Sequence, residues 1–381
     1  MNLKSVFSYG FAIFAMFFGS GNLVFPIEIG ANSLGSWVLG FLGLLLTGVL
    51  LPLSGLFAIK IYRGNIYKFF GEAGGLARTV LPFFTLSLLG SFGVVPRCIT
   101  VAHGGISYVF PQFSLWIFSL IFCVLIFLLC LKENSMIKII GEWMSPILLF
   151  CLFLLIVAGS YYAEGAQINE HRMEVFKDGF FIGYQTMDLF AAFFFSALIF
   201  KEIQASLPKN TPDHSIIKAA LLPSLIGSIL LALVYAGFVY LGAHYAHLIR
   251  GVEPEKMLPT IAFSVLGDSA TIIIAVAMVF SCLTTAIALN SIYARYLCTA
   301  FSLKEKYYLV MLSLTTGISF VISLLDFKGI ALFLAPVLEI SYPGLIFLTI
   351  MGIIGPAKFS KIKKLVFWLL TLIMAAKYFV I

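Results

Sequence analysis

The chain has 381 residues, of which 61% are hydrophobic and 11% are charged, and its formal net charge is +7. A soluble domain carries about 25% charged residues, so this composition excludes an ordinary water-soluble enzyme and indicates one membrane domain over residues 1–381. The six cysteines show no metal-binding or disulfide spacing, and we interpret them as small core residues.

Apolar stretches predict an all-α, polytopic membrane protein. A helix that crosses a bilayer needs about 20 mainly apolar residues. On that basis we predict about eleven transmembrane helices, at 6–32, 35–59, 80–108, 113–131, 137–162, 176–200, 216–243, 258–290, 307–325, 329–354 and 365–380.

The distribution of Lys and Arg predicts the orientation. With a cytoplasmic N-terminus, 17 of the 24 basic residues fall on the cytoplasmic side, 6 fall on the other side, and Arg97 lies within a span. We therefore expect a cytoplasmic N-terminus and a periplasmic or extracellular C-terminus. Membrane topology accounts for the positive net charge, so the expected surroundings are a lipid bilayer, with no nucleic acid and no protein partner.

Two of the predicted spans are interrupted. Gly19-Ser20-Gly21-Asn22 breaks the first span, and Gly183-Tyr184-Gln185-Thr186-Met187-Asp188 breaks the sixth. Each break opens a set of five spans, over about 6–162 and 176–354, and an odd number of spans per set makes the two sets inverted repeats. This pattern predicts a secondary transporter with its site at mid-membrane and one extra helix at 365–380.

The first break offers two kinds of binding group. Unwinding exposes carbonyls at the end of one half-helix, which favour a cation, and N–H groups at the start of the next, which favour a carboxylate. A glycine seam that only packs two helices together is the alternative.

Two charges lie inside predicted spans. Asp188 follows the second break, and an acid at this depth marks an ion or substrate path. The alternative is that Asp188 is a structural partner of Arg97 or of a polar neighbour. Arg97 itself is expected either to pair with Asp188 or to reach water by snorkelling.

Hydroxyl groups in the eighth span form a third candidate. Thr284 and Thr285 offer oxygen ligands for a hard cation such as Na⁺. The alternative is that both hydroxyls bond back to carbonyls of their own helix.

Several of these motifs together resemble a known family. Phe18-Gly19-Ser20-Gly21-Asn22-Leu23-Val24-Phe25-Pro26 resembles the first-helix signature of bacterial branched-chain amino acid:cation symporters. The resemblance extends to Pro96-Arg97, to Tyr184–Asp188 with Ala191-Ala192, and to Thr284-Thr285-Ala286. It implies a five-plus-five inverted-repeat fold of the LeuT type, a bacterial cytoplasmic (inner) membrane location, and uptake of Leu, Ile or Val with Na⁺.

The same resemblance implies roles for individual residues. Na⁺ would be held by carbonyls of Ala15, Phe18 and Ser281 and hydroxyls of Thr284 and Thr285. Backbone N–H groups near Ser20 and Gly21 would receive the substrate carboxylate. The substrate-binding residues implied are Gly19, Ser20, Gly21, Asn22, Tyr184, Gln185, Thr186, Asp188 and Phe190, with Tyr184 and Phe190 closing over an aliphatic side chain.

Other function classes fit the sequence less well. An intramembrane enzyme needs clustered catalytic groups, and the sequence contains no HExxH and no GxSxG motif. A channel would show a repeated pore loop. We therefore expect no enzyme and no cofactor beyond the coupling ion. The alternative that stays open is the same fold carrying another amino acid or small solute, with H⁺ as the coupling ion.

Overall fold

A computed structural model describes residues 3–131, 145–163, 165–166, 172–208, 211–355 and 360–380. All of its regular elements are helical. They are α1 (Leu3–Phe17), α2 (Ser20–Ser33), η1 (Leu34–Ser36), α3 (Trp37–Leu44), the π-helix η2 (Leu45–Leu50), α4 (Leu51–Ile61), α5 (Ile66–Gly71), α6 (Gly75–Leu89), α7 (Val94–Val109), α8 (Leu115–Cys130), α10 (Ser145–Tyr161), α11 (Arg172–Ile182), η5 (Gly183–Thr186), α12 (Asp188–Ser206), α13 (Asp213–His244), α14 (Ala246–Ile249), η6 (Pro254–Lys256), α15 (Met257–Ala300), η7 (Glu305–Tyr307), α16 (Tyr308–Ser323), α17 (Asp326–Ile354) and α18 (Ser360–Val380).

Membrane character is visible in the lengths and surfaces of these helices. Within the described ranges, seven helical stretches are long and apolar enough to cross a bilayer, and α1, α8 and the stretch Pro146–Tyr161 are shorter apolar helices. Outward-facing rings such as Trp116, Phe150 and Phe153 are more than half exposed. An apolar surface of this kind is typical of contact with lipid.

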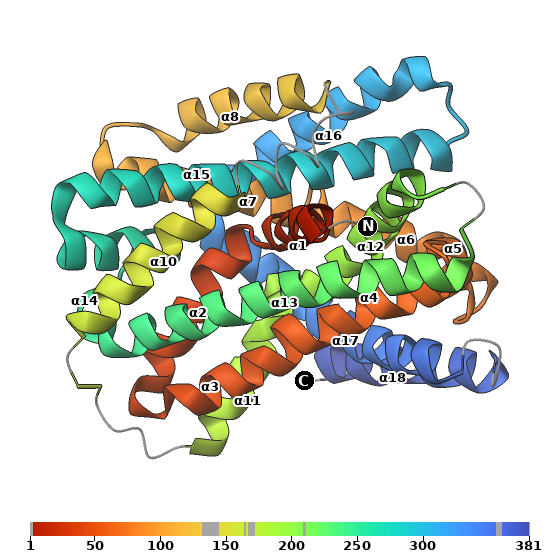
Figure 1. The fold of residues 1–381 in the computed structure, drawn as a ribbon, viewed down its shortest axis with the longest axis horizontal. Coiled ribbons are helices and arrows are strands. Elements are labelled where there is room, and N and C mark those ends of the chain that lie inside the picture. The colour runs from red at the N-terminus through yellow and green to blue at the C-terminus, as the bar shows by residue number, and fades with distance from the viewer. Residues whose placement is uncertain are drawn as a thin grey trace.

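The helices pack in a bundle around the two broken spans (Figure 1). α8 and α16 lie at one edge with α15, and α18 lies at the opposite edge beside α17. α1 and α2 pack on α13, α12 packs on α4, and α7 packs on α15. The first break therefore lies in the interior, between α12 and α15.

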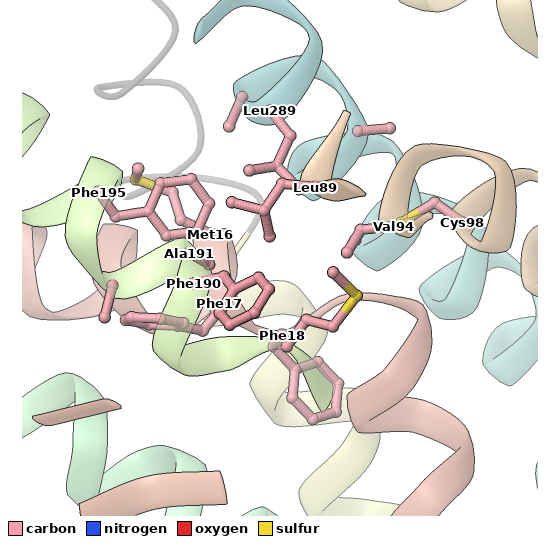
Figure 2. Packing of buried hydrophobic residues seen from close by; sticks show 14 of the residues in the cluster. Met16, Phe17, Phe18, Leu89, Val94, Cys98, Phe190, Ala191, Phe195 and Leu289 are labelled. Atoms are coloured by element: carbon pink, nitrogen blue, oxygen red, sulfur yellow. The ribbon is translucent and has the colours of Figure 1, made fainter. Parts of the chain in front are cut away.

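The interior around the first break is apolar and rich in phenylalanine (Figure 2). Phe17 at the end of α1 faces Phe195 of α12, and Phe190 of α12 and Leu289 of α15 lie nearby. The Phe17 and Phe195 rings meet edge to face, with centroids 5.4 Å apart. This packing holds the end of α1 against both neighbouring helices.

The structure confirms both predicted breaks. α1 ends at Phe17 and α2 begins at Ser20, while α11 ends at Ile182 and α12 begins at Asp188. The predicted helix at 137–162 lies partly outside the described residues, and its described part is α10.

The predicted span at 80–108 lies within the apolar stretch Gly75–Val109, but that stretch is not one continuous helix. α6 ends at Leu89 and α7 begins at Val94. A Cβ on Gly90 would lie 2.5 Å from a ring carbon of Tyr293, and one on Gly93 would lie 2.3 Å from the Leu88 carbonyl oxygen. The two glycines thus allow a close approach of backbone and neighbour that a regular helix with side chains would prevent.

Two further spans differ in detail from the prediction. The span at 35–59 contains the π-helix η2, and the predicted span at 258–290 is part of α15, which extends to Ala300. α15 is kinked at Gly267, whose φ of 74° is in the left-handed range that favours glycine.

Candidate functional site

The two breaks lie directly against each other. A Cβ on Gly21, in the first turn of α2, would lie 3.1 Å from the Cα of Thr186 in η5. Gly19 precedes α2 with φ −119° and ψ −149°, and its N–H donates to the Asn22 Oδ1 at 3.1 Å. The Asn22 side chain thus closes the start of α2 in the manner of a capping box.

The second break ends on a left-handed residue. Met187 has φ 61°, and its N–H donates to the Tyr184 carbonyl at 3.0 Å. The Thr186 hydroxyl donates to the Gly183 carbonyl at 2.9 Å and accepts from the Asp188 N–H at 3.4 Å. Asp188 is therefore the first residue of α12, where the helix dipole favours a negative charge.

Asp188 joins three helices. Its Oδ2 accepts hydrogen bonds from the Asn22 Nδ2 and from the Tyr235 hydroxyl of α13, each at 2.8 Å, and Asn22 also donates to Tyr235. All three side chains are buried. A buried carboxylate with two charge-assisted hydrogen bonds fixes the relative position of the two breaks.

The five predicted ligand oxygens, and with them the Ser281 hydroxyl, converge where the end of α1 meets α15. The Ser281 hydroxyl donates to the Phe18 carbonyl at 2.5 Å, and the Thr284 and Thr285 hydroxyls donate to the Ala15 carbonyl at 3.4 and 3.2 Å. Thr284 also donates to the Ser281 carbonyl at 2.8 Å. The structure thus brings together all five residues of the predicted cation site.

The alternative of bonding back to the same helix holds for only one hydroxyl of the pair. Thr284 does bond back to its own helix, as the alternative predicted, but Thr285 donates to carbonyls of another helix, at Ala15 and at Met16 (3.3 Å). The hydroxyls of α15 therefore satisfy carbonyls that the end of α1 leaves without helical partners.

Arg97 corrects both expectations made for it. Its side chain is 0% exposed, so it does not reach water, and among the described residues it forms no ion pair with Asp188. Instead, Nη1 donates to the Gln185 carbonyl at 2.8 Å, and the guanidinium carbon lies 5.6 Å from the centre of the Phe25 ring. Arg97 thus contacts both broken spans.

Aromatic rings stack beside the second break. Tyr184 and Phe190 both stack on Tyr342 of α17, with centroids 4.3 and 4.9 Å apart. The first two were predicted from the sequence, but Tyr342 was not. Tyr235 and Thr47 were also not identified from the sequence as residues of this region. Thr47 donates to the Phe180 carbonyl at 2.9 Å, just before the second break. Hydroxyl groups within long apolar spans were the available signal.

A cavity of about 300 Å³ adjoins this region. It is lined by Phe25, Glu28, Ile182, Gln185, Pro254, Phe327, Lys328, Ala331, Leu332 and Ala335. Phe25 and Gln185 line the cavity and also contact Arg97, so they lie between the cavity and the buried guanidinium.

Solved structures with a similar fold define the architecture. A manganese transporter mutant from Eremococcus coleocola matches with a TM-score of 0.62 and 14% identity over 97% of this chain and 85% of that one. Mhp1, a nucleobase-cation-symport-1 family transporter, matches with a TM-score of 0.64 and 15% identity over 90% and 77%. Identities this low show the fold alone, and together with the apolar helices they define an all-helical membrane protein with this fold.

The family follows from the sequence. A family model described as "Branched-chain amino acid transport protein" matches residues 2–379, and the chain belongs to this family. The branched-chain amino acid permease BrnQ of Corynebacterium glutamicum is 26% identical over 94% of this chain and 83% of its own length. The branched-chain amino acid permease BraB of Bacillus subtilis is 28% identical over 92% and 80%. These relatives are transport permeases, in agreement with the expectation that the chain is not an enzyme.

Proposed function

We propose that this protein is a secondary active transporter that takes up Leu, Ile or Val together with Na⁺ by alternating access. The family supports a branched-chain amino acid as cargo. The observation that carries the coupling ion is the convergence of oxygens from Ala15, Phe18, Ser281, Thr284 and Thr285 where α1 ends against α15.

The chemistry of these oxygens favours Na⁺. Carbonyl and hydroxyl oxygens suit hard cations. The five residues include no carboxylate, so a cation of low charge fits them best. Carbonyls at the end of a half-helix add the negative end of its dipole, as in other transporters with broken helices.

The substrate site lies at the two breaks. N–H groups of Ser20 and Gly21 at the start of α2 favour a carboxylate. On the other side, Asp188 and the carbonyls of Gln185 and Thr186 favour an amine. The ring stack that includes Tyr184 and Phe190 offers an apolar surface for an aliphatic side chain. Gly19 and Asn22 shape the start of α2.

The membrane arrangement is part of the proposal. Eleven spans with a cytoplasmic N-terminus and an external C-terminus place most Lys and Arg residues on the cytoplasmic face of a bacterial inner membrane. Repeats over about 6–162 and 176–354 would be inverted, each with its broken span first, and the helix at 365–380 would be added to them. The two confirmed breaks support this arrangement.

The driving force follows from the charge moved. Na⁺ couples only if it binds the outward-open and inward-open arrangements with different affinity. At a potential of 100 mV one inward charge supplies about 2.3 kcal/mol, which is roughly 50-fold in accumulation before any sodium gradient is counted.

Initial rates of labelled leucine uptake into proteoliposomes test this function. We expect an inward Na⁺ gradient to stimulate uptake, and unlabelled isoleucine and valine to compete with leucine. Stimulation of uptake by an inward H⁺ gradient without Na⁺ would show that H⁺ is the coupling ion. Competition by unrelated solutes, but not by isoleucine or valine, would show that the substrate is not a branched-chain amino acid. No uptake under either gradient would contradict transport itself.

A further inference from the structure

Only one of the three guanidinium nitrogens of Arg97 has a hydrogen-bond partner. Nη1 donates to the Gln185 carbonyl at 2.8 Å, but Nε and Nη2 have no hydrogen-bond partner although both atoms are buried. Asp188 is not in ion-pair distance of Arg97, and its Oδ2 accepts from Asn22 and Tyr235 instead. Across the described residues, Arg97 lacks a carboxylate within ion-pair distance.

A buried cation without an anion is costly. An arginine stays cationic inside proteins, so its charge must be balanced by an anion. The backbone increases this need. α7 begins at Val94, after the break at Gly90–Gly93, so Arg97 is the fourth residue of the helix. The start of a helix carries the positive end of its dipole, which disfavours a cation and favours an anion.

The two free nitrogens have the geometry of a carboxylate receptor. Nε and Nη2 lie on the same edge of the guanidinium plane, and two parallel N–H groups on one edge fit the two oxygens of a carboxylate. The Gln185 carbonyl holds the remaining nitrogen, Nη1, and the Phe25 ring lies against the group. These contacts orient the free edge before any ligand arrives.

Further unpartnered polar atoms belong to the same region. The Ser20 hydroxyl of α2, the Gln185 Oε1 of η5 and the Tyr342 hydroxyl of α17 are buried without hydrogen-bond partners. Buried polar atoms normally have partners, so a group of them on the two breaks and on a ring stacked against the second break indicates a ligand with both donors and acceptors. An α-amino acid has both.

We propose that the Arg97 guanidinium binds the carboxylate of the amino-acid substrate through its Nε and Nη2 edge. This inference rests on the proposed function and extends it. The N–H groups at the start of α2 are then a second, weaker contact, and the third span takes part in recognition together with the first and the sixth. Arg97 makes the transporter select ligands that carry a carboxylate.

The experiment compares leucine with leucinol, in which a hydroxymethyl group replaces the carboxylate. Binding of each to the purified full-length protein is measured by competition with labelled leucine. For the wild type we expect leucinol to bind at least about 100-fold more weakly than leucine, because two charge-assisted hydrogen bonds are lost. In Arg97→Gln we expect this ratio to fall below about 10, with leucine weakened and leucinol nearly unchanged.

Arg97→Lys decides the question if Arg97→Gln does not fold. It keeps the charge but removes the two-nitrogen edge, so we expect the leucine-to-leucinol ratio to fall at least about tenfold. Thermal stabilisation by Na⁺ is the test of folding, because that cation site does not include Arg97. Arg295→Gln, which removes an exposed arginine near the end of α15, is the matched control and should keep the wild-type ratio.

The outcomes separate this inference from the function. A wild type that binds neither leucine nor isoleucine contradicts the proposed function, and with it this site. A wild type that prefers leucine, with the same preference in Arg97→Lys or Arg97→Gln, overturns the role of Arg97 and leaves the function intact.

Discussion

The hydroxyl of Thr285 provides the sharpest test of the cation site. Its side chain is buried, and its Oγ1 lies 3.2 Å from the Ala15 carbonyl oxygen and 3.3 Å from that of Met16. Thr285→Val keeps the shape of the side chain but replaces the hydroxyl with a methyl group. The substitution removes one of the five oxygens and turns a methyl group towards two carbonyls at the end of α1.

The magnitude follows from the groups left without partners. An unsatisfied buried polar group costs about 1–3 kcal/mol. If the binding free energy of Na⁺ falls by this amount, the Na⁺ concentration for half-maximal leucine uptake rises about 5- to 150-fold, since 1.4 kcal/mol corresponds to tenfold. Initial uptake rates into proteoliposomes, measured over a series of Na⁺ concentrations, give this value directly. The maximal rate at saturating Na⁺ should change much less.

Thr349→Val is the matched control. Thr349 is equally buried, and its hydroxyl donates to the Leu345 carbonyl of its own helix, α17, at 2.7 Å. The same chemical change there should leave the Na⁺ dependence unaltered. If Thr285→Val stays within twofold of the wild type, or if Thr349→Val shifts the Na⁺ dependence as much, the five oxygens do not form the coupling site.

Three other substitutions test the first break, the docking of α18 and the charge at the second break. Gly19→Ala would place a Cβ 2.9 Å from the Thr285 side chain, so we expect Na⁺-dependent uptake to fall at least about tenfold. A Cβ on Gly75 would meet no atom within 4 Å, so the control Gly75→Ala should transport normally. Lys363→Met removes a fully buried ammonium group 2.9 Å from Glu72, so it should lower the melting temperature in a thermal-shift assay. Because Glu72 is 17% exposed, the loss of stability should be smaller than the about 3–5 kcal/mol that breaking a fully buried ion pair costs. Asp188→Asn keeps an acceptor oxygen but removes the charge, so the hydrogen bonds from Asn22 and Tyr235 weaken and leucine uptake should fall to about a tenth. Full uptake would make this residue a packing group.

The two breaks were predictable because their signal is local. Gly19 and Gly21 lie two residues apart in an apolar run, and Asp188 follows a cluster that no membrane helix favours. The break at Gly90–Gly93 carries a similar signal but was missed, because Leu, Phe and Val around it keep the segment apolar. Hydropathy measures how well a segment suits lipid, and it does not report the path of the backbone.

Contacts between distant residues could not be predicted. Nothing near Tyr235 or Tyr342 in the sequence indicates that one bonds to Asp188 and that the other stacks on Tyr184. The expected pairing of Arg97 with Asp188 was wrong, because two opposite charges inside a membrane protein suggest each other whatever their positions. The geometry instead gives the acid two neutral donors and leaves the cation a free edge.

Basic residues also differ in what the sequence can say about them. The charge rule treats all Lys and Arg residues in the connections alike, but Lys60 and Lys363 are buried. Lys60 donates to the Ala220 carbonyl at 2.9 Å, and Lys363 pairs with Glu72. Lys363 therefore ties α18 to the segment between α5 and α6, which assigns the extra helix a contact that composition alone does not reveal.

The geometry of the first break gives coupling a physical basis. Only Phe18 and Gly19 separate α1 from α2. The Phe18 carbonyl belongs to the oxygens of the proposed cation site, while the Gly19 N–H donates to Asn22, which in turn donates to Asp188. A cation that fixes this two-residue segment therefore also fixes the groups proposed to meet the substrate. Coupling between two sites is typically 1–3 kcal/mol, about 5- to 150-fold in affinity, and it is equal in both directions. The quantity to measure is thus the factor by which bound Na⁺ changes the affinity for leucine. A factor near one would place the cation away from this break.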